Sequence, residues 1–356
     1  MNKVNFSAGP AILPQAVLQQ ASEAIINYAG TGLSLLEVSH RSKEFVANME
    51  KATQLVRELM QLNDDYAVLF LSGGASTQFF MAPMNLLNED EEAGYVNTGA
   101  WARNAIKEAK AFGKINVLAS SEADNFNYIP KGYDVPDNLK YLHLTSNNTI
   151  FGTQYKAWPS ANVPLVCDMS SDIFSKPIDV SRFDLIYAGA QKNMGPAGVT
   201  LVVVKKSALG TVSRYLPTML NYETHIKNES MYNTPPVFAI YVAMLTMEWI
   251  KENGGLTGME LRNETKAALL YDEIDRNPLF YGHAVPEDRS LMNICFRLHD
   301  ETMEADFLRL CQQNQLDGLK GHRSVGGFRA SIYNAMEKEG VQRLVETMQQ
   351  FEREKA

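Results

Sequence analysis

Residues 185–204 read LIYAGAQKNMGPAGVTLVVV. Two apolar runs, Leu185–Ala188 and Val199–Val204, are typical of buried strands, and the small residues and the Gly-Pro pair between them predict a turn. The turn carries a single cation, Lys192. A lysine in such a place can form a Schiff base with an aldehyde cofactor. On this pattern alone, a solvated loop lysine is the commoner outcome.

Five further apolar runs precede this stretch and alternate with helical segments. Several are almost continuously hydrophobic, as strands covered on both faces are. The alternation predicts an α/β fold, with a mostly parallel seven-stranded sheet covered by helices. Two amphipathic helices are predicted before it, at residues 14–28 and 42–62. The apolar face of the second comprises Phe45, Met49, Ala52, Val56 and Leu59. The five runs are Ala67–Leu71, Ala93–Asn97, Ile115–Ala119, Tyr141–Thr145 and Leu165–Asp168.

The pattern changes after a long helix predicted at residues 238–251. That helix meets Asn253-Gly254-Gly255, which is a helix-stop signal. We therefore expect a large domain at residues 16–255 and a smaller α+β domain at 256–356, with residues 1–15 packing near the smaller one. The elements predicted for the small domain are a helix at 260–276, a strand at 292–298, a helix at 304–314, a strand at 328–332 and a helix at 340–352.

Composition excludes several classes of partner. The chain has 356 residues, of which 45% are hydrophobic and 21% charged, so it is long enough for about two globular domains. A net charge of -8 with no Lys/Arg block argues against nucleic acid and against an anionic membrane surface. The N-terminus lacks the apolar core of a signal peptide, and the longest apolar run, Val237–Leu245, is too short for the ~20 residues of a membrane span. Three widely spaced cysteines predict reduced thiols in the cytoplasm and no metal site.

A glycine-rich turn, Leu71-Ser72-Gly73-Gly74-Ala75-Ser76-Thr77, lies between a predicted strand and a predicted helix. Small residues there allow backbone N–H groups to approach a phosphate at the start of the helix. The spacing fits neither the P-loop nor the dinucleotide-binding pattern. A plain turn with a Ser/Thr helix cap explains the same residues equally well.

Asp168 ends an otherwise apolar strand. At that end of a parallel sheet, side chains face ligands, and a carboxylate can pair with a pyridinium nitrogen. The alternative is an aspartate that caps the turn after the strand.

Three arginines and two histidines lie close to turns at the two ends of the chain. Arginine forks bind carboxylate and phosphate groups through two hydrogen bonds. For any single arginine, surface charge at the end of a loop is the commoner outcome. Trp101, after Asn97-Thr98-Gly99-Ala100, is either a stacking wall or a core aromatic. The cationic residues are His40, Arg41, His322, Arg323 and Arg329.

Several of these segments resemble the phosphoserine aminotransferase family, a group of class V aminotransferases that use pyridoxal 5'-phosphate. The strongest likeness is SRFDLIYAGAQKNMGPAG at residues 181–198. The resemblance follows the family's order over nearly the whole chain. The other matching segments are residues 5–10, 37–42, 73–76, 233–236 and 321–334.

The resemblance implies the fold type I architecture of aspartate aminotransferase and a homodimer with shared active sites. It also implies conversion of 3-phosphohydroxypyruvate and L-glutamate to O-phospho-L-serine and 2-oxoglutarate, the transamination step of serine biosynthesis. In some bacteria the same enzyme serves pyridoxine biosynthesis through a phosphorylated threonine analogue, 4-phosphohydroxy-L-threonine.

The resemblance also implies a role for each matching position. Lys192 becomes the Schiff-base lysine, and Asp168 the partner of the ring nitrogen. Arg329 becomes the clamp for the substrate α-carboxylate. The cofactor contacts are Thr149 to the ring hydroxyl, Trp101 to the ring face, and Ala75, Ser76 and Gln191 to the phosphate, with Asn233 and Thr234 supplied by the neighbouring subunit. The pocket for the distal anion of the substrate comprises His40, Arg41, His322 and Arg323.

Two departures and three rivals remain at this stage. Some relatives carry Gly-Arg in place of Ala75-Ser76, which removes one cation, and some carry Ser in place of Ala8. The rivals of the same fold are an alanine–glyoxylate aminotransferase and a cysteine desulfurase, whose nucleophile would have to be Cys295 or Cys311. The third rival is a non-catalytic binding or regulatory module of this fold, which intact Lys192, Asp168 and Arg329 disfavour.

Overall fold

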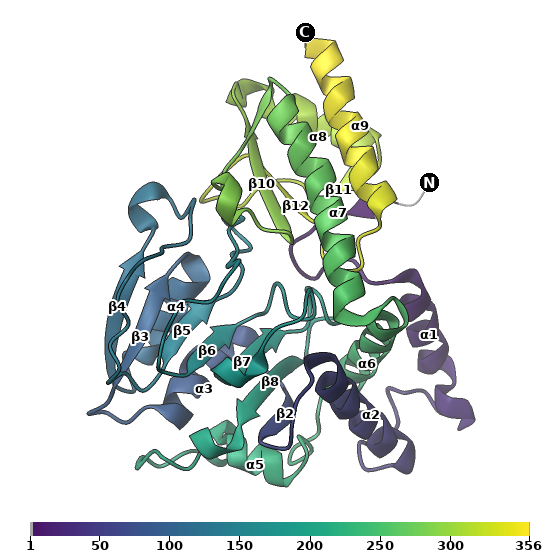
Figure 1. The fold of residues 1–356 in the computed structure, drawn as a ribbon. Coiled ribbons are helices and arrows are strands. Elements are labelled where there is room, and N and C mark those ends of the chain that lie inside the picture. Colours follow the sequence, from purple (N-terminus) through teal and green to yellow (C-terminus); the bar gives the residue numbers. More distant parts are fainter. Residues whose placement is uncertain (1–2, 356) are drawn as a thin grey trace.

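A seven-stranded sheet organises the larger part of the molecule (Figure 1). The computed structural model describes residues 3–355. The order of the strands is β2-β8-β7-β6-β5-β3-β4, and the neighbouring pairs from β7 to β4 are parallel. The prediction of a mostly parallel sheet is confirmed, and each strand lies within two residues of its predicted position. The strands are β2 (Tyr66–Leu71), β3 (Glu92–Asn97), β4 (Lys114–Ser120), β5 (Leu142–Thr145), β6 (Leu165–Asp168), β7 (Phe183–Gly189) and β8 (Thr200–Lys205).

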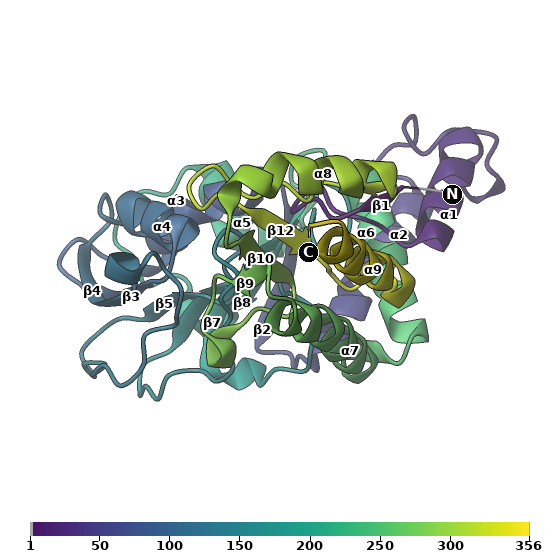
Figure 2. The ribbon, with the colours of Figure 1, turned by 90° about the horizontal axis from the view of Figure 1, so that it is seen from above.

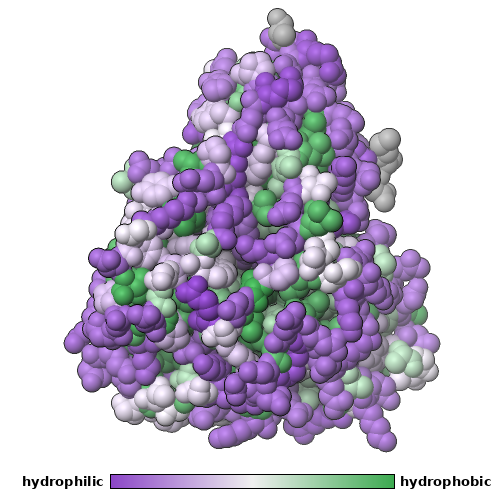
Figure 3. All heavy atoms as spheres, in the orientation of Figure 1, coloured by the Kyte–Doolittle hydropathy of each residue, from purple (hydrophilic) through white to green (hydrophobic). Residues whose placement is uncertain are grey.

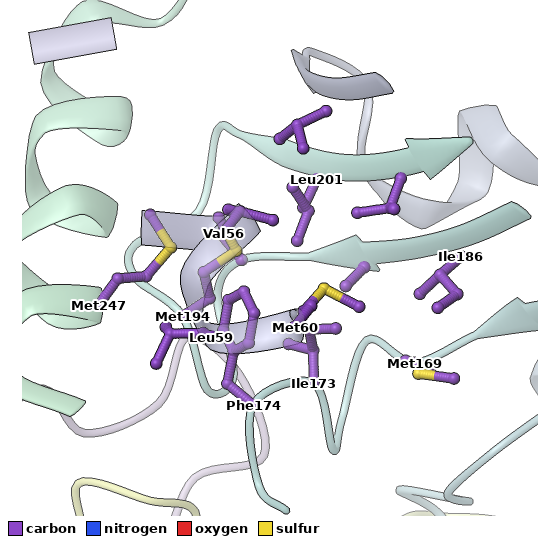
Figure 4. Packing of buried hydrophobic residues seen from close by; sticks show 14 of the residues in the cluster. Val56, Leu59, Met60, Met169, Ile173, Phe174, Ile186, Met194, Leu201 and Met247 are labelled. Atoms are coloured by element: carbon purple, nitrogen blue, oxygen red, sulfur yellow. The ribbon is translucent and has the colours of Figure 1, made fainter. Parts of the chain in front are cut away.

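Helices cover both faces of this sheet, which explains the continuous apolar runs. One face packs against α1 (Gln15–Ile26), α2 (Lys43–Met60) and α6 (Val237–Glu252), and the other against α3 (Gly74–Leu86), α4 (Ala100–Ala109) and α5 (Tyr222–Lys227). All five residues of the predicted apolar face of α2 are buried. Figure 4 shows Val56, Leu59 and Met60 of α2 gathered with the buried side chains Ile173, Phe174 and Met194. Burying a side chain of this size stabilises the fold by roughly 1.5–3 kcal/mol.

Strand β8 runs antiparallel to both of its neighbours, β2 and β7. Consequently β2 points in the same direction as β7, β6, β5 and β3. The carboxyl ends of these five strands therefore meet at one edge of the sheet, where ligand sites of α/β proteins form. Asp168 is the last residue of β6, and Trp101 lies in the first turn of α4, after β3. The loops after β2, β5 and β7 carry Gly73, Thr149 and Lys192.

A second sheet of three antiparallel strands lies above the first, in the order β12-β10-β9 (Figure 1). The strands are β9 (Phe280–Gly282), β10 (Asn293–Leu298) and β12 (Phe328–Ser331), and their helices are α7 (Gly255–Arg276), α8 (Glu304–Gln313) and α9 (Lys338–Lys355). Helices α7 and α9 lie side by side in both views (Figures 1 and 2). Helix α7 starts five residues before its predicted position because Gly254, at φ 91°, starts a new helix directly after the stop signal of α6.

The N-terminal segment contacts this second region. Strand β1 (Val4–Asn5) pairs in parallel with β11 (Leu316–Asp317), and Phe6 is buried in the apolar cluster of the small sheet. Two-residue strands have no periodicity, so the sequence did not reveal this pair. The domain boundaries 16–255 and 256–356 stay a prediction.

The surface in Figure 3 is largely hydrophilic, with scattered apolar side chains rather than one broad patch. Single exposed apolar side chains are ordinary on proteins. Within residues 3–355, every helix is too short or too polar to cross a membrane.

Candidate active site

Lys192 lies in the loop that follows β7, and its amine points into the protein. The turn is closed by backbone hydrogen bonds from Ala190 N to Val199 O (3.0 Å) and from Met194 N to Ala190 O (3.1 Å). The Nζ atom donates to Thr149 Oγ1 over 2.9 Å and lies 5.9 Å from the ring centre of Trp101. Lys192 is therefore held by side chains and is not a solvated loop lysine.

The surroundings of Lys192 make its amine a better nucleophile. Burial lowers the pKa of Lys192 to about 8, because desolvation disfavours the charged form, and the charge of Arg329 lowers it further. Asp168 and Asp172 oppose this shift. With a pKa of about 8, roughly a tenth of the amine is neutral at pH 7, against less than a thousandth for an ordinary lysine.

Asp168 ends β6 beside the Lys192 loop and is 5% exposed. One of its oxygens accepts from Ser170 N over 2.9 Å, so the aspartate does cap the following turn. Burial raises the pKa of Asp168, while the charge of Lys192 and the bond from Ser170 oppose the rise. A second cation facing the carboxylate would stabilise its ionised form.

The glycine-rich turn leads from β2 into the first turn of α3. Gly73 adopts φ 99°, and a Cβ atom at this position would lie 2.1 Å from Thr77 Oγ1, so the turn requires glycine on both counts. Helix α3 has no side-chain cap, which removes the alternative of a Ser/Thr cap. The N–H groups at the start of the helix, next to Ala75 and exposed Ser76, remain available to an anion.

Arg329 reaches the same place from the small sheet. It lies on β12, and its NH1 atom donates to Thr149 O over 3.2 Å. Its Nε atom is buried without a hydrogen-bond partner among the described residues. Thr149 thus contacts Lys192 through its hydroxyl and Arg329 through its carbonyl, which brings the candidate lysine and the candidate carboxylate clamp together.

Several buried polar atoms at this edge of the sheet have no partner among residues 3–355, although buried polar groups are nearly always hydrogen-bonded. Sequence reasoning missed three of their residues, Thr98, Thr145 and Asn148. The only sequence signal was a polar residue just after an apolar strand. Thr145 lies in register with Asp168, and the Oδ1 atom of Asn148 lies 2.6 Å from where a Cβ of Gly99 would be. The unpartnered atoms are Thr98 Oγ1, Trp101 Nε1, Thr145 Oγ1, Asn148 Oδ1 and Arg329 Nε.

Two further predicted residues flank this group. His322 Nδ1 lies 2.7 Å from Ser324 Oγ, and the pKa of His322 is lowered by burial and then by the charges of Arg329 and Arg323. Arg323 is exposed. Two of the four residues predicted for the anion pocket, His322 and Arg323, therefore lie near Arg329. Gln191, next to Lys192, is half-buried and accepts from Ala11 N through its carbonyl over 2.9 Å.

Four predicted residues make no hydrogen bond or ion pair with Lys192 among the described residues. His40 and Arg41 lie between α1 and α2, where Arg41 N donates to Ser39 Oγ. Asn233 and Thr234 are exposed and line a cavity of about 260 Å³ together with Ser72, Gly73 and Thr77. The residues that line this cavity include neither Lys192 nor Asp168.

The donor set fits pyridoxal phosphate. A buried amine of lowered pKa can combine with its aldehyde, a buried carboxylate could pair with its ring nitrogen, and a helix start without a cap could hold its phosphate. The unpartnered polar atoms are donors and acceptors that a bound ligand could satisfy.

The fold and this site together define an aminotransferase that depends on pyridoxal phosphate. The sequence matches the class-V aminotransferase family over residues 3–344. It is 58% identical to the phosphoserine aminotransferase of Flavobacterium johnsoniae and 56% identical to that of Parabacteroides distasonis, with at least 99% of each chain covered. The solved phosphoserine aminotransferase of Bacillus circulans subsp. alkalophilus superposes with a TM-score of 0.97 at 48% identity, covering 100% of this chain and 99% of that one. The chain belongs to the class-V aminotransferases and, among them, to the phosphoserine aminotransferase family.

The cysteines disfavour a desulfurase. Cys295 lies in β10 and Cys311 in α8, and both are buried. Burial raises the pKa of each thiol to about 12, so neither forms the thiolate that a nucleophile requires.

Proposed function

We propose that this enzyme transfers the amino group of L-glutamate to 3-phosphohydroxypyruvate, giving O-phospho-L-serine and 2-oxoglutarate in serine biosynthesis. It acts in the cytoplasm as a homodimer, and the 2-oxo acid that corresponds to 4-phosphohydroxy-L-threonine is a second amino acceptor of the same site, giving 4-phosphohydroxy-L-threonine for pyridoxine biosynthesis. The observation that carries the proposal is the group Lys192, Thr149 and Arg329, with His322 and Arg323 beside it. The names of the full-length relatives support the substrates.

The chain's own residues account for the steps at the substrate. When bound, pyridoxal phosphate supplies an aldehyde that combines with amines and a ring that accepts electrons from the substrate Cα. Arg329 holds the α-carboxylate and so aims the Cα–H bond. The neutral amine of Lys192 takes the proton from Cα and returns it on the other side of the C–N bond, as a general base and then a general acid. Asp168 would keep a proton on the ring nitrogen, and one water molecule has to reach the site, because water supplies the keto oxygen of 2-oxoglutarate.

The distal pocket has to accept a γ-carboxylate and a phosphate in turn. Both are anions of similar reach, and guanidinium and imidazole groups can bind either one. Because the charges of Arg329 and Arg323 add to burial in lowering the pKa of His322, a bound anion would relieve that repulsion.

Replacing Arg323 by alanine should selectively weaken use of the phosphorylated keto acid. Losing one charge-assisted contact costs about 1.5–3 kcal/mol, or roughly ten- to a hundredfold in kcat/KM. The measurement compares kcat/KM for 3-phosphohydroxypyruvate and for hydroxypyruvate in the wild type and the variant. Arg309→Ala is the control, because Arg309 is exposed on α8 and pairs with Asp306. A wild type that does not discriminate, or an equal loss for both keto acids, would contradict the assignment.

A shared active site explains where His40, Arg41, Asn233 and Thr234 lie. Among residues 3–355, the hydrogen-bond partner of the Lys192 amine is Thr149 and none of these four, and Asn233 and Thr234 are exposed. In a two-fold dimer, an exposed residue of one subunit can complete the site of the other, and the exchange is reciprocal. We therefore assign these four residues to the site of the neighbouring subunit.

Mixed dimers test the sharing. Lys192→Ala removes the amine, and Thr234→Glu places a carboxylate against the cofactor phosphate, so each homodimer should be nearly inactive. If the site is shared, one site of a mixed dimer carries both lesions and the other carries neither. Equal amounts reassorted at random should then restore roughly a quarter of wild-type activity. Mass spectrometry confirms that mixed dimers form, and circular dichroism confirms that Thr234→Glu is folded. Absence of recovery under those conditions rejects the shared site.

A further inference from the structure

The segment Ile332–Asn334 follows β12, the strand that carries Arg329, and it is buried. Helix α7 holds its carbonyl groups. The fully buried amine of Lys266 donates to Ile332 O (2.9 Å) and Tyr333 O (2.6 Å), and Arg262 Nε donates to Asn334 O (3.1 Å). Two basic side chains on one helix thus fix the segment that follows Arg329.

Asn334 links this segment to the large sheet. Its side chain donates to Phe174 O over 2.9 Å and accepts from Asn263 Nδ2 of α7 over 2.8 Å. Its backbone N–H donates to the side chain of Asn193 over 3.0 Å. Asn193 directly follows Lys192, so the link ends one residue from the candidate catalytic lysine.

Asn193 joins three parts of the site through one amide. Its oxygen accepts from Asn334, and its nitrogen donates to Ser171 O (2.9 Å), in the turn that follows Asp168, and to Met292 Sδ (3.5 Å). The residue is 3% exposed, so water does not compete for these hydrogen bonds. Both polar ends of the side chain are used, which fixes its orientation.

A second amide provides a parallel connection next to Thr149. Asn147 Nδ2 donates to Ser171 Oγ (2.9 Å) and to Asn293 Oδ1 (2.8 Å). Asn293 in turn donates to Ser331 Oγ of β12 over 3.0 Å. Two routes of hydrogen bonds thus join the ends of the large sheet to the strand of Arg329, and Asn193 belongs to the one that includes the lysine loop.

We propose that Asn193 is a positioning residue, whose side-chain amide fixes Lys192 relative to Asp168 and to the Arg329 strand. The inference depends on the roles proposed above for Lys192 and Arg329. Arg329 holds the substrate at one end, and Lys192 has to meet Cα between Arg329 and the cofactor. A displacement of about 1 Å between such groups can cost on the order of a hundredfold in rate. The amide that sets their separation therefore acts on the reaction without touching substrate.

The test replaces Asn193 by leucine, which has similar volume and no hydrogen-bonding groups. Asn85→Leu is the matched control. Asn85 is 2% exposed, donates to Met81 O and Leu220 O, and accepts from Tyr222 N. Both variants remove a buried amide with the same kinds of partner, so both should lower the Tm of the holoenzyme. Only Asn193→Leu should alter the geometry of the site.

Three readouts separate positioning from stability. Relative to Asn85→Leu, kcat/KM for L-glutamate in Asn193→Leu should fall about ten- to a hundredfold. A displaced Arg329 should raise KM, and a displaced Lys192 should lower kcat. The pH midpoint of the visible absorption of the bound cofactor should also move upward, because a displaced Arg329 no longer opposes protonation near Lys192. Asn193→Ser, which keeps a hydroxyl group, should recover part of both effects and replaces the leucine variant if that one does not fold.

The measurements distinguish a failure of the positioning role of Asn193 from a failure of the proposed function. If Asn193→Leu loses as much Tm as Asn85→Leu but keeps kcat/KM within about threefold of it and leaves the midpoint unmoved, positioning by Asn193 is rejected and the residue is only structural. The roles of Lys192 and Arg329 are unaffected by that result. The role of Lys192 fails separately, if Lys192→Ala keeps its activity.

Discussion

Replacing Lys192 by alanine should lower the rate of transamination by at least about a thousandfold, because one side chain supplies both the amine that binds the cofactor and the group that moves the proton. Added pyridoxal phosphate should no longer undergo the change in visible absorption that the wild type produces on binding it. The rate is measured with L-glutamate and 3-phosphohydroxypyruvate. The visible absorption is recorded after pyridoxal phosphate is added to the cofactor-free chain.

A second lysine provides the control for this experiment. Lys156 also has its pKa lowered to about 8, mainly by burial and then by the charge of Lys176. It lies outside the group around Thr149, so Lys156→Ala should keep activity within about twofold. A Lys192→Ala enzyme with normal turnover and normal absorption would show that the amine lies elsewhere.

Replacing Asp168 by asparagine should lower turnover by about a hundred- to a thousandfold and should not destabilise the cofactor-free chain. A neutral amide of the same shape cannot hold a proton on the ring nitrogen, so electrons from Cα are no longer stored. Burial raises the pKa of Asp168 in the folded state, so folding becomes less favourable as pH rises through the ordinary aspartate range. Removing the charge removes that cost.

Lower turnover without a lower Tm distinguishes a catalytic carboxylate from a structural one. Turnover and the Tm of the cofactor-free chain are measured at pH 7 for Asp168→Asn and for Asp184→Asn. Asp184 lies on β7, burial raises its pKa as well, and Lys205 lies 3.9 Å away. Asp184→Asn should keep turnover within about threefold. A lower Tm together with unchanged turnover in Asp168→Asn would mean that the carboxylate supports the fold only.

The large sheet could be predicted because its strands are covered on both faces. The run Leu165–Asp168 is apolar until its last residue, and β6 occupies those four positions. Strand β4 shows the limit of this signal, since it is an edge strand with Val117 43% exposed. The antiparallel direction of β8 was not predicted, because an apolar run carries no information on strand direction.

Some residues of the candidate site could be predicted from the sequence, and others could not. Lys192 and Asp168 could be proposed from sequence because each is a polar residue at the end of an apolar strand. Thr98, Thr145 and Asn148 follow the same rule but look like ordinary turn residues, and only their unpartnered buried atoms distinguish them. Ser171, Asn193 and Asn334 could not be recognised from the sequence, because a serine or asparagine that bridges two segments has the same sequence context as one that faces water.

The sequence by itself determined the order of helices and strands, the buried faces and the edge where polar residues gather, because periodicity and strand ends are properties of neighbouring residues. Only the tertiary structure decided that Arg329 reaches Thr149 across 180 residues, that burial lowers the pKa of Lys192 to about 8, and that the start of α3 is left without a cap. Such contacts depend on strand register and on packing between the two sheets. These are set by the shapes of side chains from distant parts of the chain, and a local pattern does not record them.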